Sequence, residues 1–429
     1  MLDLKLIRED SEGVKTALAR RDPGLPAIVD DILAKDAEWR SATASAENLR
    51  AKQRADSENI AAGKRAGEDV SEALVRMKEL SSEVKELTEQ ARSAQGQLEA
   101  LLAPLPNLPD PTAAPGPEDE LVREVGKIPE LDFEPRDHLE LAGDGIDMDR
   151  AARLSGSRFA YLKGDLVMLE LALVRWVLEK LRGRGFEPVI PPVLVREQAL
   201  YGTGFLPDTE QQIYELGEDE LFLVGTSEVA LASLHADEIL DAERLPLRYA
   251  GFSPCFRREA GAAGKDTRGI FRVHQFDKVE MFSFVAPDES EGEHERILAI
   301  EEEILTELGL AYRAVNIAVT DLGSSAAKKY DCEAWLASQG RYRELTSCSN
   351  TTDYQARRLN IRVRRDRQGG QGDGGRGIET LHTLNGTAVA VGRTLVALLE
   401  NGQQADGGVE LPQCLVPYGA PARLASGLS

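Results

Sequence analysis

Long apolar runs and paired cysteines are both missing from this chain of 429 residues. No stretch reaches the roughly 18 apolar residues that a membrane-spanning helix needs. Residues 1–5 also lack the basic-then-apolar order that begins a secretory signal. The four cysteines lie far apart with no Cys-x-x-Cys pair, so the sequence indicates neither a disulfide framework nor structural zinc. We therefore expect a reduced, cytoplasmic protein with no membrane partner.

Positive charge is scarce as well, because 51 Lys and Arg residues face 73 Asp and Glu residues, for a formal net charge of -22. This balance argues at first against a nucleic-acid partner, since binding phosphate needs positive potential. Net charge governs solubility, however, whereas binding depends on a local patch. One stretch reverses the sign with five cations, here called the basic cluster: Arg50, Lys52, Arg54, Lys64 and Arg65. It is either a solvated helix end or a nucleic-acid contact.

Two heptad patterns fill residues 25–102, where helix formers dominate and Gly and Pro are rare. The first series alternates steps of four and three and holds Ile28, Ile32, Trp39, Ala42, Ala46, Leu49 and Ile60. The second holds Val70, Leu74, Met77, Val84, Ala91, Ala94, Leu98 and Leu101. It has polar breaks at Ser81 and Thr88 and one slip in spacing between Ala91 and Ala94. The patterns predict an antiparallel coiled-coil arm about 50 Å long, with the basic cluster at or beside its far tip.

A proline-rich stretch at residues 104–118 follows the arm. Proline cannot continue a helix, so we expect a domain boundary here. The sequence therefore predicts an N-terminal domain at 1–103, a linker at 104–118 and a second domain at 119–429. A Gly-rich, Arg-containing loop at 367–377 is most simply a flexible connection within that second domain.

The second domain alternates short strand-like pieces with few helices, and its pieces have hairpin spacing. This arrangement favours an antiparallel sheet and an α+β fold over a βαβ layout. We expect a long amphipathic helix at 166–182 and a helical tail at 385–400. The expected strands are 189–190, 221–224, 247–256, 271–276, 279–284, 314–318, 342–346, 355–363 and 381–384.

Residues 255–259 and 268–280 bring arginine, aromatic and acidic side chains into two apolar stretches joined by a Gly-rich turn. Alternation along a strand would point Arg257 and Glu259 to one face and Arg258 to the other. A hairpin with a salt-bridged, solvated face would have a similar composition. The order of residues, however, resembles motif 2 of the class II aminoacyl-tRNA synthetases. The run RGIFRVHQFDKVE is similar to that of the seryl members of the class.

Activation of an amino acid requires its carboxylate to attack the α-phosphorus of ATP, which calls for positioning and charge neutralisation. Arg257 is the candidate catalytic residue to bridge both groups, because guanidinium binds such oxygens in a bidentate manner. Glu259 can accept from the adenine amino group and Phe276 can stack on the ring. The resemblance implies the same roles and adds Val273 to the ATP site. We also count Arg258 in that site, although the family usually has serine there.

Residues 344–350 resemble the ATP-binding loop of the family. An acidic residue three positions before a hydroxyl can supply two hard oxygen ligands to Mg²⁺, so Glu344 and Ser347 are the candidate metal ligands. The resemblance also places Leu345 and Thr346 at ATP, with the Thr346 hydroxyl where serine is usual. Taken without its neighbours, this spacing is a weak signal for a metal.

Residues 382–387 and 391–394 resemble class II motif 3, in which Arg393 would neutralise the γ-phosphate of ATP as a second catalytic residue. An exposed arginine on an ordinary helix is the alternative for that position alone. The helix expected at 166–182 and the proline-rich strand after it resemble motif 1, which implies a homodimer.

Hydroxyls and carboxylates, rather than apolar groups, mark the expected amino-acid pocket. Such groups suit a small substrate with an ammonium and one hydroxyl, and they reject analogues that leave buried partners unpaired. The Thr-Ser-Glu run matches the serine-binding loop of the family. The candidate serine contacts are Thr226, Ser227, Glu228, Glu280, Asn385 and Thr387.

The resemblance covers nearly the whole chain. It implies Mg²⁺-dependent use of ATP to join L-serine to tRNA(Ser), and to tRNA(Sec), through seryl-adenylate. One alternative is an amino acid:carrier-protein ligase on the same core, but such relatives lack a long arm like the one at 28–101. The other is a non-catalytic coiled-coil scaffold, which would be expected to lose Arg257, Glu280, Glu344 or Arg393. All four are present.

Overall fold

The computed structural model describes residues 1–207, 213–260, 264, 266–366 and 376–426. The chain forms two units, one of residues 2–105 and one of residues 106–429. The Gly-rich loop expected at 367–377 lies outside the described residues except for its last two positions. Within the described ranges, no helix combines the length and the apolar character needed to cross a bilayer.

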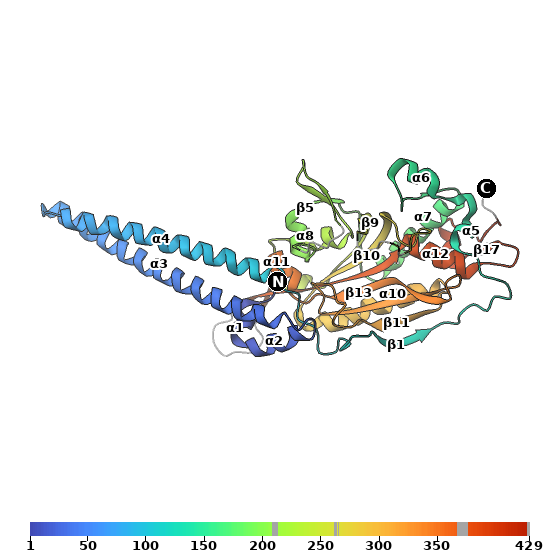
Figure 1. Cartoon of the computed structure of the whole chain (residues 1–429), viewed down its shortest axis with the longest axis horizontal. Helices are drawn as coiled ribbons and strands as arrows, with labels where there is room; N and C mark the ends of the chain where they lie inside the picture. Colours follow the sequence, from blue (N-terminus) through green and yellow to red (C-terminus); the bar gives the residue numbers. More distant parts are fainter. Residues whose placement is uncertain (208–212, 261–263, 265, 367–375, 427–429) are drawn as a thin grey trace. The chain divides into compact units, whose positions relative to one another are not determined.

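The first unit consists of helices (Figure 1), namely α1 (Leu4–Glu9), α2 (Ser11–Ala19), α3 (Pro26–Ala66) and α4 (Ser71–Leu102). Helix α3 begins with a proline, whose missing amide is tolerated in the first turn. It ends at Gly67, which has a φ of +77°, and the amide of Glu68 donates to the Gly63 carbonyl at 3.0 Å. This left-handed turn reverses the chain. Helix α4 then packs back along α3, so the predicted antiparallel helical arm is confirmed.

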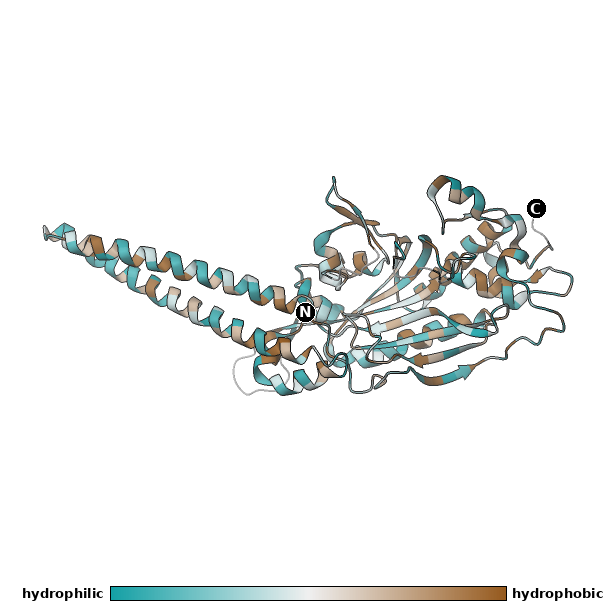
Figure 2. Cartoon of the chain, viewed as in Figure 1, coloured by the Kyte–Doolittle hydropathy of each residue, from teal (hydrophilic) through white to brown (hydrophobic). Residues whose placement is uncertain are grey.

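The apolar seam of α4 follows an unbroken heptad, and the predicted slip in its spacing is wrong. The seam carries Val70, Ala73, Met77, Leu80, Val84, Leu87, Ala91, Ala94, Leu98 and Leu101. Leu74, which the sequence pattern placed in the seam, is 44% exposed, whereas Leu80 is only 8% exposed. Ala73 and Leu74 are adjacent apolar residues. The sequence therefore allows the seam to advance from Val70 by three residues to Ala73 or by four residues to Leu74. Figure 2 shows hydrophobic and hydrophilic residues alternating along both helices of the arm.

A buried ion pair fastens the base of the arm. Asp36 of α3 is fully buried and accepts from Arg8 of α1 at 2.5 Å and from Arg40 at 2.9 Å. The hydrogen bond to Arg8 is the main cause that lowers the pKa of Asp36. By contrast, the five side chains of the basic cluster are exposed. Arg50 nevertheless reaches across to α4 and donates to the Thr88 hydroxyl at 2.8 Å.

The second unit is built on an eight-stranded sheet with the order β1-β11-β12-β13-β16-β10-β9-β4. Every neighbouring pair is antiparallel except β4 and β9, so the predicted antiparallel α+β fold is confirmed. The strands are β1 (Glu120–Val125), β4 (Glu187–Val189), β9 (Leu247–Phe256), β10 (Gln275–Val285), β11 (Tyr312–Asn316), β12 (Lys328–Leu336), β13 (Arg341–Asn350) and β16 (His382–Ala390).

Shorter elements surround this sheet. The helices are α5 (His138–Ala142), α6 (Met148–Ser155), α7 (Asp165–Gly183), α8 (Glu197–Thr203), α9 (Glu228–Ala232), α10 (Ser290–Glu307), α11 (Tyr354–Arg358) and α12 (Val391–Gly402). The small sheets use β2 (Ile146–Asp147), β3 (Tyr161–Leu162), β5 (Leu194–Arg196), β6 (Tyr214–Leu216), β7 (Leu221–Leu223), β8 (Ile239–Asp241), β14 (Arg362–Asp366), β15 (Arg376–Thr380), β17 (Val409–Glu410) and β18 (Arg423–Leu424).

One hydrophobic core joins α7, α10 and α12 to the large sheet. Leu166, Leu169, Leu173 and Val177 recur at helical spacing and bury one side of α7, as the amphipathic pattern predicts. Along β10, Val279 and Met281 enter the same core. Alternation then leaves the intervening residues of β10 for the opposite face of the sheet.

Three of the predicted elements are wrong in part. Residues 271–274 precede β10 instead of forming a strand, and residues 354–358 form helix α11. The tail expected to be helical from residue 385 continues β16 as far as Ala390, and only then does α12 begin. Small and β-branched residues such as Thr387 and Val389 occur in both helices and strands, so their pattern does not distinguish the two. Here the pairing with β10 makes the segment a strand. The sequence pattern did not predict strand β12 or helix α10.

A pair of matched leucine substitutions tests the register of the arm. Leu80→Ala should destabilise the arm by about 2 kcal/mol, because it removes a buried side chain from the seam. Amides of residues 71–102 should then exchange about thirtyfold faster in the full-length protein. Leu74→Ala, on the exposed face, should change the exchange less than about threefold. Equal effects, or a larger effect at Leu74, would contradict the register.

Candidate active site

A cleft of about 490 Å³ lies over β10, β13 and β16. Its wall includes most of the residues that the sequence singled out, although they come from distant parts of the chain. These are Thr226, Glu228, Arg257, Glu259, Val273, Phe276, Glu280, Glu344, Leu345, Ser347, Asn385, Thr387 and Arg393. The structure therefore brings these residues together in a single cavity.

Strand β10 supplies the floor of the cleft by simple alternation. Phe276, Lys278 and Glu280 occupy every second position and line the cavity. Val279, between them, enters the hydrophobic core below. Lys278 was not among the predicted site residues, yet it lies two positions before Glu280, and the same alternation would have found it.

A β-bulge brings Glu344 and Ser347 to the same face of β13. Residues three apart on a regular strand point to opposite faces. Here, however, Cys332 of β12 pairs with Thr346 and Glu333 pairs with Glu344, which leaves Leu345 as an extra residue. The bulge shifts the alternation by one position, so Glu344 and Ser347 both line the cleft. Leu345 and Thr346 are consecutive buried residues at this point.

A second bulge acts in the same way on β16. Val279 of β10 pairs with Val389 and Glu280 pairs with Thr387, so Ala388 is the extra residue. Thr387 and Ala390 consequently line the cleft together, although they are three positions apart. Asn385 joins them by ordinary alternation. The pocket-facing side of β16 is thus set by its pairing with β10.

Carboxylates and hydroxyls gather at one end of the cleft. Lys278 forms an ion pair with Glu280 and donates to the Thr226 hydroxyl at 2.7 Å. The Thr387 hydroxyl donates to Glu280 at 3.3 Å. All four side chains are buried, so their hydrogen bonds offset the cost of removing polar groups from water. This end can bind an ammonium and a hydroxyl of a small molecule.

Glu228 adds a second acidic group to this end. Its carboxylate accepts from Gln355 at 2.7 Å and from Asn385 at 3.0 Å. Burial, and then the nearby charge of Glu280, raises the pKa of Glu228 to about 7. A bound cation would lower this pKa by favouring the charged form. Gln355 follows the 344–350 string but was not predicted as a site residue, because the sequence pattern placed it in a strand instead of helix α11.

Cations gather at the other end of the cleft. Arg257 donates from Nε to the Gly225 carbonyl at 3.2 Å, and its guanidinium lies 5.3 Å from the centre of the Phe276 ring. Arg393 donates to the Glu344 carbonyl at 3.1 Å and approaches the Glu344 carboxylate at 3.5 Å. The aromatic and carbonyl supports of Arg257 hold its guanidinium without offsetting its charge.

Glu344 has the electrostatics of a ligand for a cation. Burial tends to raise its pKa, but the positive charges of Arg393, Lys329 and Arg257 outweigh this effect and hold the pKa below its usual value. The side chain is still 42% exposed toward the cleft. Glu344 is therefore a charged carboxylate with free access to a ligand. With the Ser347 hydroxyl on the same face, the pair supplies two oxygen ligands of the kind that a hard divalent cation prefers.

Glu259 lies beside the cleft after β9 has ended. Strand β9 stops at Phe256, so the alternation expected through residues 257–259 does not hold. Glu259 has a φ of +52° and accepts from Arg272 at 2.6 Å. Arg258 is exposed and does not line the cleft, so its predicted ATP contact has no support here. Arg272 also lines the cleft and was not predicted.

Two further predicted contacts need correction. The Ser227 side chain is fully buried and donates to the Gly251 carbonyl at 3.3 Å, so it supports the pocket from behind. The Thr346 hydroxyl donates to Glu301 of α10 at 3.0 Å, away from the cleft. Thr346 follows the extra residue of the bulge, which a count along a regular strand does not reveal. We therefore assign Ser227 and Thr346 structural roles.

Two family models match this chain. Residues 1–109 match the seryl-tRNA synthetase N-terminal domain, and residues 211–402 match the tRNA synthetase class II core domain (G, H, P, S and T). The first match covers the helical arm. The second covers most of the residues that line the cleft.

Relatives with the same organisation cover nearly the whole chain. A serine--tRNA ligase of Streptomyces coelicolor is 50% identical over 425 residues, with 97% of both chains covered. One of Acidothermus cellulolyticus is 51% identical, with 97% of this chain and 98% of the relative covered. The crystal structure of seryl-tRNA synthetase from Pyrococcus horikoshii complexed with ATP has a TM-score of 0.92 at 42% identity, covering 99% of this chain and 100% of that chain.

A substitution at Thr346 separates its structural role from the nucleotide contact that the sequence predicts. Thr346→Val should lower the free energy of unfolding by about 1–2 kcal/mol, because Glu301 loses a buried hydrogen bond. ATP affinity, measured by calorimetric titration, should change less than about twofold. Ser347→Ala, in the cleft, should give the reverse pattern. Weakened ATP binding by Thr346→Val with unchanged unfolding would restore the nucleotide contact.

Proposed function

Since the chain belongs to the seryl-tRNA synthetase family, we propose that it joins L-serine to transfer RNA at the expense of ATP. The observation that carries this proposal is the single cleft with a cationic end and a carboxylate–hydroxyl end. Serine carries a carboxylate, an ammonium and one hydroxyl, so it can bridge the two ends. The match at 1–109 also argues against the carrier-protein ligase and scaffold alternatives.

The reaction takes place in two steps. The serine carboxylate attacks the α-phosphorus of ATP, and pyrophosphate leaves. A hydroxyl of the terminal ribose of the transfer RNA then attacks the seryl carbonyl of the adenylate, and AMP leaves. Arg257 bridges the α-phosphate and the attacking carboxylate, and it neutralises the charge that develops between them. Arg393 binds the γ-phosphate and stabilises the departing pyrophosphate. The adenine ring stacks on Phe276, its amino group donates to Glu259, and the chain at Val273 and Leu345 borders the nucleotide.

Mg²⁺ accompanies ATP in this proposal. Glu344 and Ser347 would hold the ion, because the bulge turns both oxygens toward the cleft. When bound there, Mg²⁺ would supply positive charge that offsets the negative charge of the phosphate groups. Arg393 contacts Glu344 and so keeps the carboxylate oriented beside the phosphate site.

The serine pocket is the acidic end of the cleft. The substrate ammonium lies between Glu228 and Glu280, and its hydroxyl pairs with Thr387 or Glu280. Asn385 holds Glu228 by a direct hydrogen bond. Thr226 holds Glu280 indirectly, because it accepts from Lys278, which forms an ion pair with Glu280. An amino acid without a hydroxyl would leave buried partners unsatisfied and would bind poorly.

The helical arm is proposed to bind the transfer RNA. A protein of net charge -22 needs a local cationic surface for this task, and the exposed basic cluster on α3 provides one. Recognition of an RNA by a helical arm relies on shape and backbone contacts more than on base edges. On this basis tRNA(Ser) is the main partner, and tRNA(Sec) is a second. A cytoplasmic location follows from these partners.

We also propose that the chain forms a homodimer through the region of α7. Large apolar side chains are exposed on this helix and near it, which is costly in water unless another surface covers them. They include Leu171, which is 55% exposed, and Ile190, which is 82% exposed. Val167 and Met168 are also exposed on α7, as are Leu154 in α6 and Tyr161 in β3.

Exchange of pyrophosphate into ATP tests the serine assignment and the role of Arg257. Only serine should support strong exchange in the wild-type protein. Arg257→Ala should reduce it at least about a hundredfold, because one charge-assisted contact to the transition state is worth about 3 kcal/mol. Arg258→Ala is the matched control and should stay within about twofold. Equal exchange with alanine would contradict the serine pocket, and full exchange by Arg257→Ala would remove Arg257 from the reaction.

Magnesium dependence tests the metal site. Glu344→Gln keeps a hydrogen-bond acceptor for Arg393 but removes the charge, so half-maximal exchange should require about ten times more Mg²⁺. Glu333→Gln is the control, since Glu333 pairs with Glu344 across the strands but does not line the cleft. An unchanged Mg²⁺ requirement in Glu344→Gln would show that this carboxylate does not bind the ion.

Charge substitutions in the basic cluster test the arm. Lys52, Arg54, Lys64 and Arg65 are to be changed to glutamine together, while Arg50 is kept because it bonds to Thr88. The affinity for tRNA(Ser) should fall. The slope of log affinity against log salt concentration should also become less steep, by up to about one unit for each phosphate that the arm no longer neutralises. Serine activation should be unchanged. Exchanging lysine and arginine at the same positions keeps the charge and should preserve the slope. An unaltered slope in the glutamine variant would show that the cluster does not contact RNA.

A further inference from the structure

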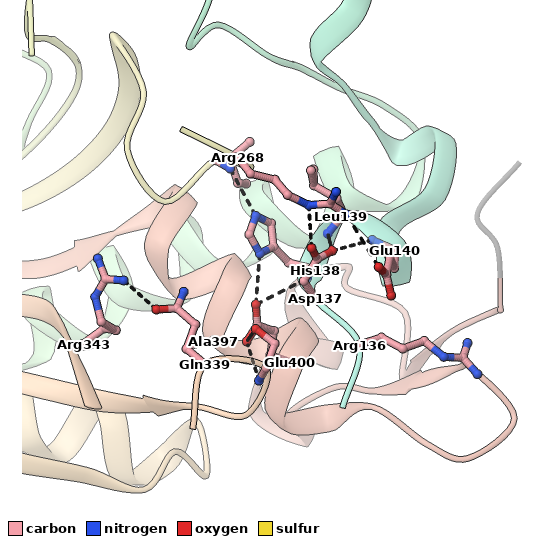
Figure 3. A network of polar contacts seen from close by, with 12 residues as sticks. Arg136, Asp137, His138, Leu139, Glu140, Arg268, Gln339, Arg343, Ala397 and Glu400 are labelled. Atoms are coloured by element: carbon pink, nitrogen blue, oxygen red, sulfur yellow. Dashed lines mark hydrogen bonds and ion pairs between the residues drawn. The ribbon is translucent and has the colours of Figure 1, made fainter. Parts of the chain in front are cut away.

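His138 lies outside the proposed chemistry and does not line the cleft, but it contacts the backbone at Ile270, which does. It is the first residue of α5, and its ring is almost fully buried. The Asp137 carboxylate caps this helix by accepting from the amides of Leu139 and Glu140 at 3.0 Å. Figure 3 shows the ring between Glu400 and the segment that carries Arg268. Three separate parts of the fold therefore meet at this side chain.

The hydrogen bonds of the ring indicate its tautomer. The amide of Ile270 donates to Nε2 of His138 at 3.2 Å. A backbone amide can only donate, so Nε2 must accept, and the proton of a neutral ring lies on Nδ1. Nδ1 is 3.0 Å from Glu400 of α12, which is the acceptor that this tautomer requires. Glu400 is itself fixed, because the amide and the hydroxyl of Ser338 donate to its other oxygen at 3.2 and 2.7 Å.

The backbone at Gly269 is shaped to this ring. Gly269 has a φ of +81°, which favours glycine. A Cβ added there would lie only 2.0 Å from Nε2 of His138, so any larger residue would push the segment off the imidazole. Arg268, just before it, pairs with Asp137 at 2.7 Å. The contact between His138 and the Arg268–Ile270 stretch is thus specified by residues on both sides.

This stretch leads directly to the nucleotide end of the cleft. Ile270 and Phe271 line the cavity. The guanidinium carbons of Arg343 and Arg393 lie 4.1 and 4.8 Å from the centre of the Phe271 ring. Moving Ile270 would therefore move the ring that supports Arg393. None of these contacts involves Glu228 or Glu280 at the serine end of the cleft.

We infer that His138 is a positioning residue for ATP, because its imidazole connects the fixed carboxylate of Glu400 to the amide of Ile270. The hydrogen bond to Ile270 fixes the Phe271 ring, and this ring sets the place of Arg393 against the phosphates. The inference rests on the proposed ATP site and adds a residue that contacts neither the nucleotide nor serine.

Two amide substitutions separate the two sides of the ring. Glutamine can place its carbonyl oxygen near the position of Nε2 and still accept from Ile270. Asparagine can place its amide near Nδ1, where it reaches Glu400 but not Ile270. In pyrophosphate exchange, His138→Asn should raise the KM for ATP about tenfold, whereas His138→Gln should stay within about threefold. The KM for serine should be unchanged in both variants.

A structural control distinguishes positioning from general loosening. Ser338→Ala removes the hydroxyl bond to Glu400 but keeps the bond from the Ser338 amide, so Glu400 stays in place; the variant should lower the melting temperature and leave both KM values unchanged. Equal increases in the KM for ATP in the asparagine and glutamine variants would overturn the inference, as would no increase in either. Failure of the wild-type protein to exchange with serine would instead count against the proposed function.

The wild-type protein provides a measurement that does not depend on how the variants fold. Hydrogen exchange of the peptide that contains residues 269–273 should show a protected amide for Ile270 in the absence of ATP, slower by at least about a hundredfold than an open loop. Protection that appears only after ATP is added would overturn the inference, because the nucleotide, and not His138, would then be ordering the segment.

Discussion

Two single-residue bulges are the constraint on which the cleft depends. A regular strand exposes every second side chain to one face, so it cannot present residues three apart to the same ligand. The extra residues Leu345 and Ala388 break this rule at two neighbouring places in the sheet. Glu344 and Ser347 thereby share a face, as do Thr387 and Ala390. The hydrogen bond from Thr346 to buried Glu301 holds the first bulge from the side of the core.

Some charged residues of the cleft are paired with one another, whereas Arg257 lacks a carboxylate partner in the part of the chain that the structure describes. Arg272 and Arg343 near the cleft are tied to Glu259 and Asp266. Among the described residues, no carboxylate pairs with Arg257, which instead rests on Phe276 and a carbonyl oxygen. A cation held in this way keeps its charge for phosphate. At the opposite end, burial raises the pKa of Glu228 to about 7, which a substrate ammonium would reverse.

Most of the cleft could be predicted from the sequence because its residues occur in short, ordered strings. It was harder to predict which face of its strand or helix each residue would occupy. Thr346 and Ser347 are adjacent hydroxyls, and only the pairing of β13 with β12 decides which one enters the cleft. In the arm, Leu74 and Leu80 both suit a heptad, and only packing against α3 selects Leu80. The sequence specifies which residues are available, and long-range pairing then selects their faces.

The composition of the proline-rich stretch fits either a linker between two domains or a fixed part of the second unit. Its prolines end the arm, yet residues 106–118 belong to the unit that contains the cleft. Asn107 donates to the carbonyls of Ser325 and Thr351 at 2.9 and 2.8 Å, and the Thr112 carbonyl accepts from Asn316 of β11 at 2.9 Å. Proline restricts the unfolded chain, so ordering such a segment costs less entropy than ordering a flexible one. Because Ser325 lines the cleft, the stretch is a fixed part of the scaffold behind the active site rather than a loose tether.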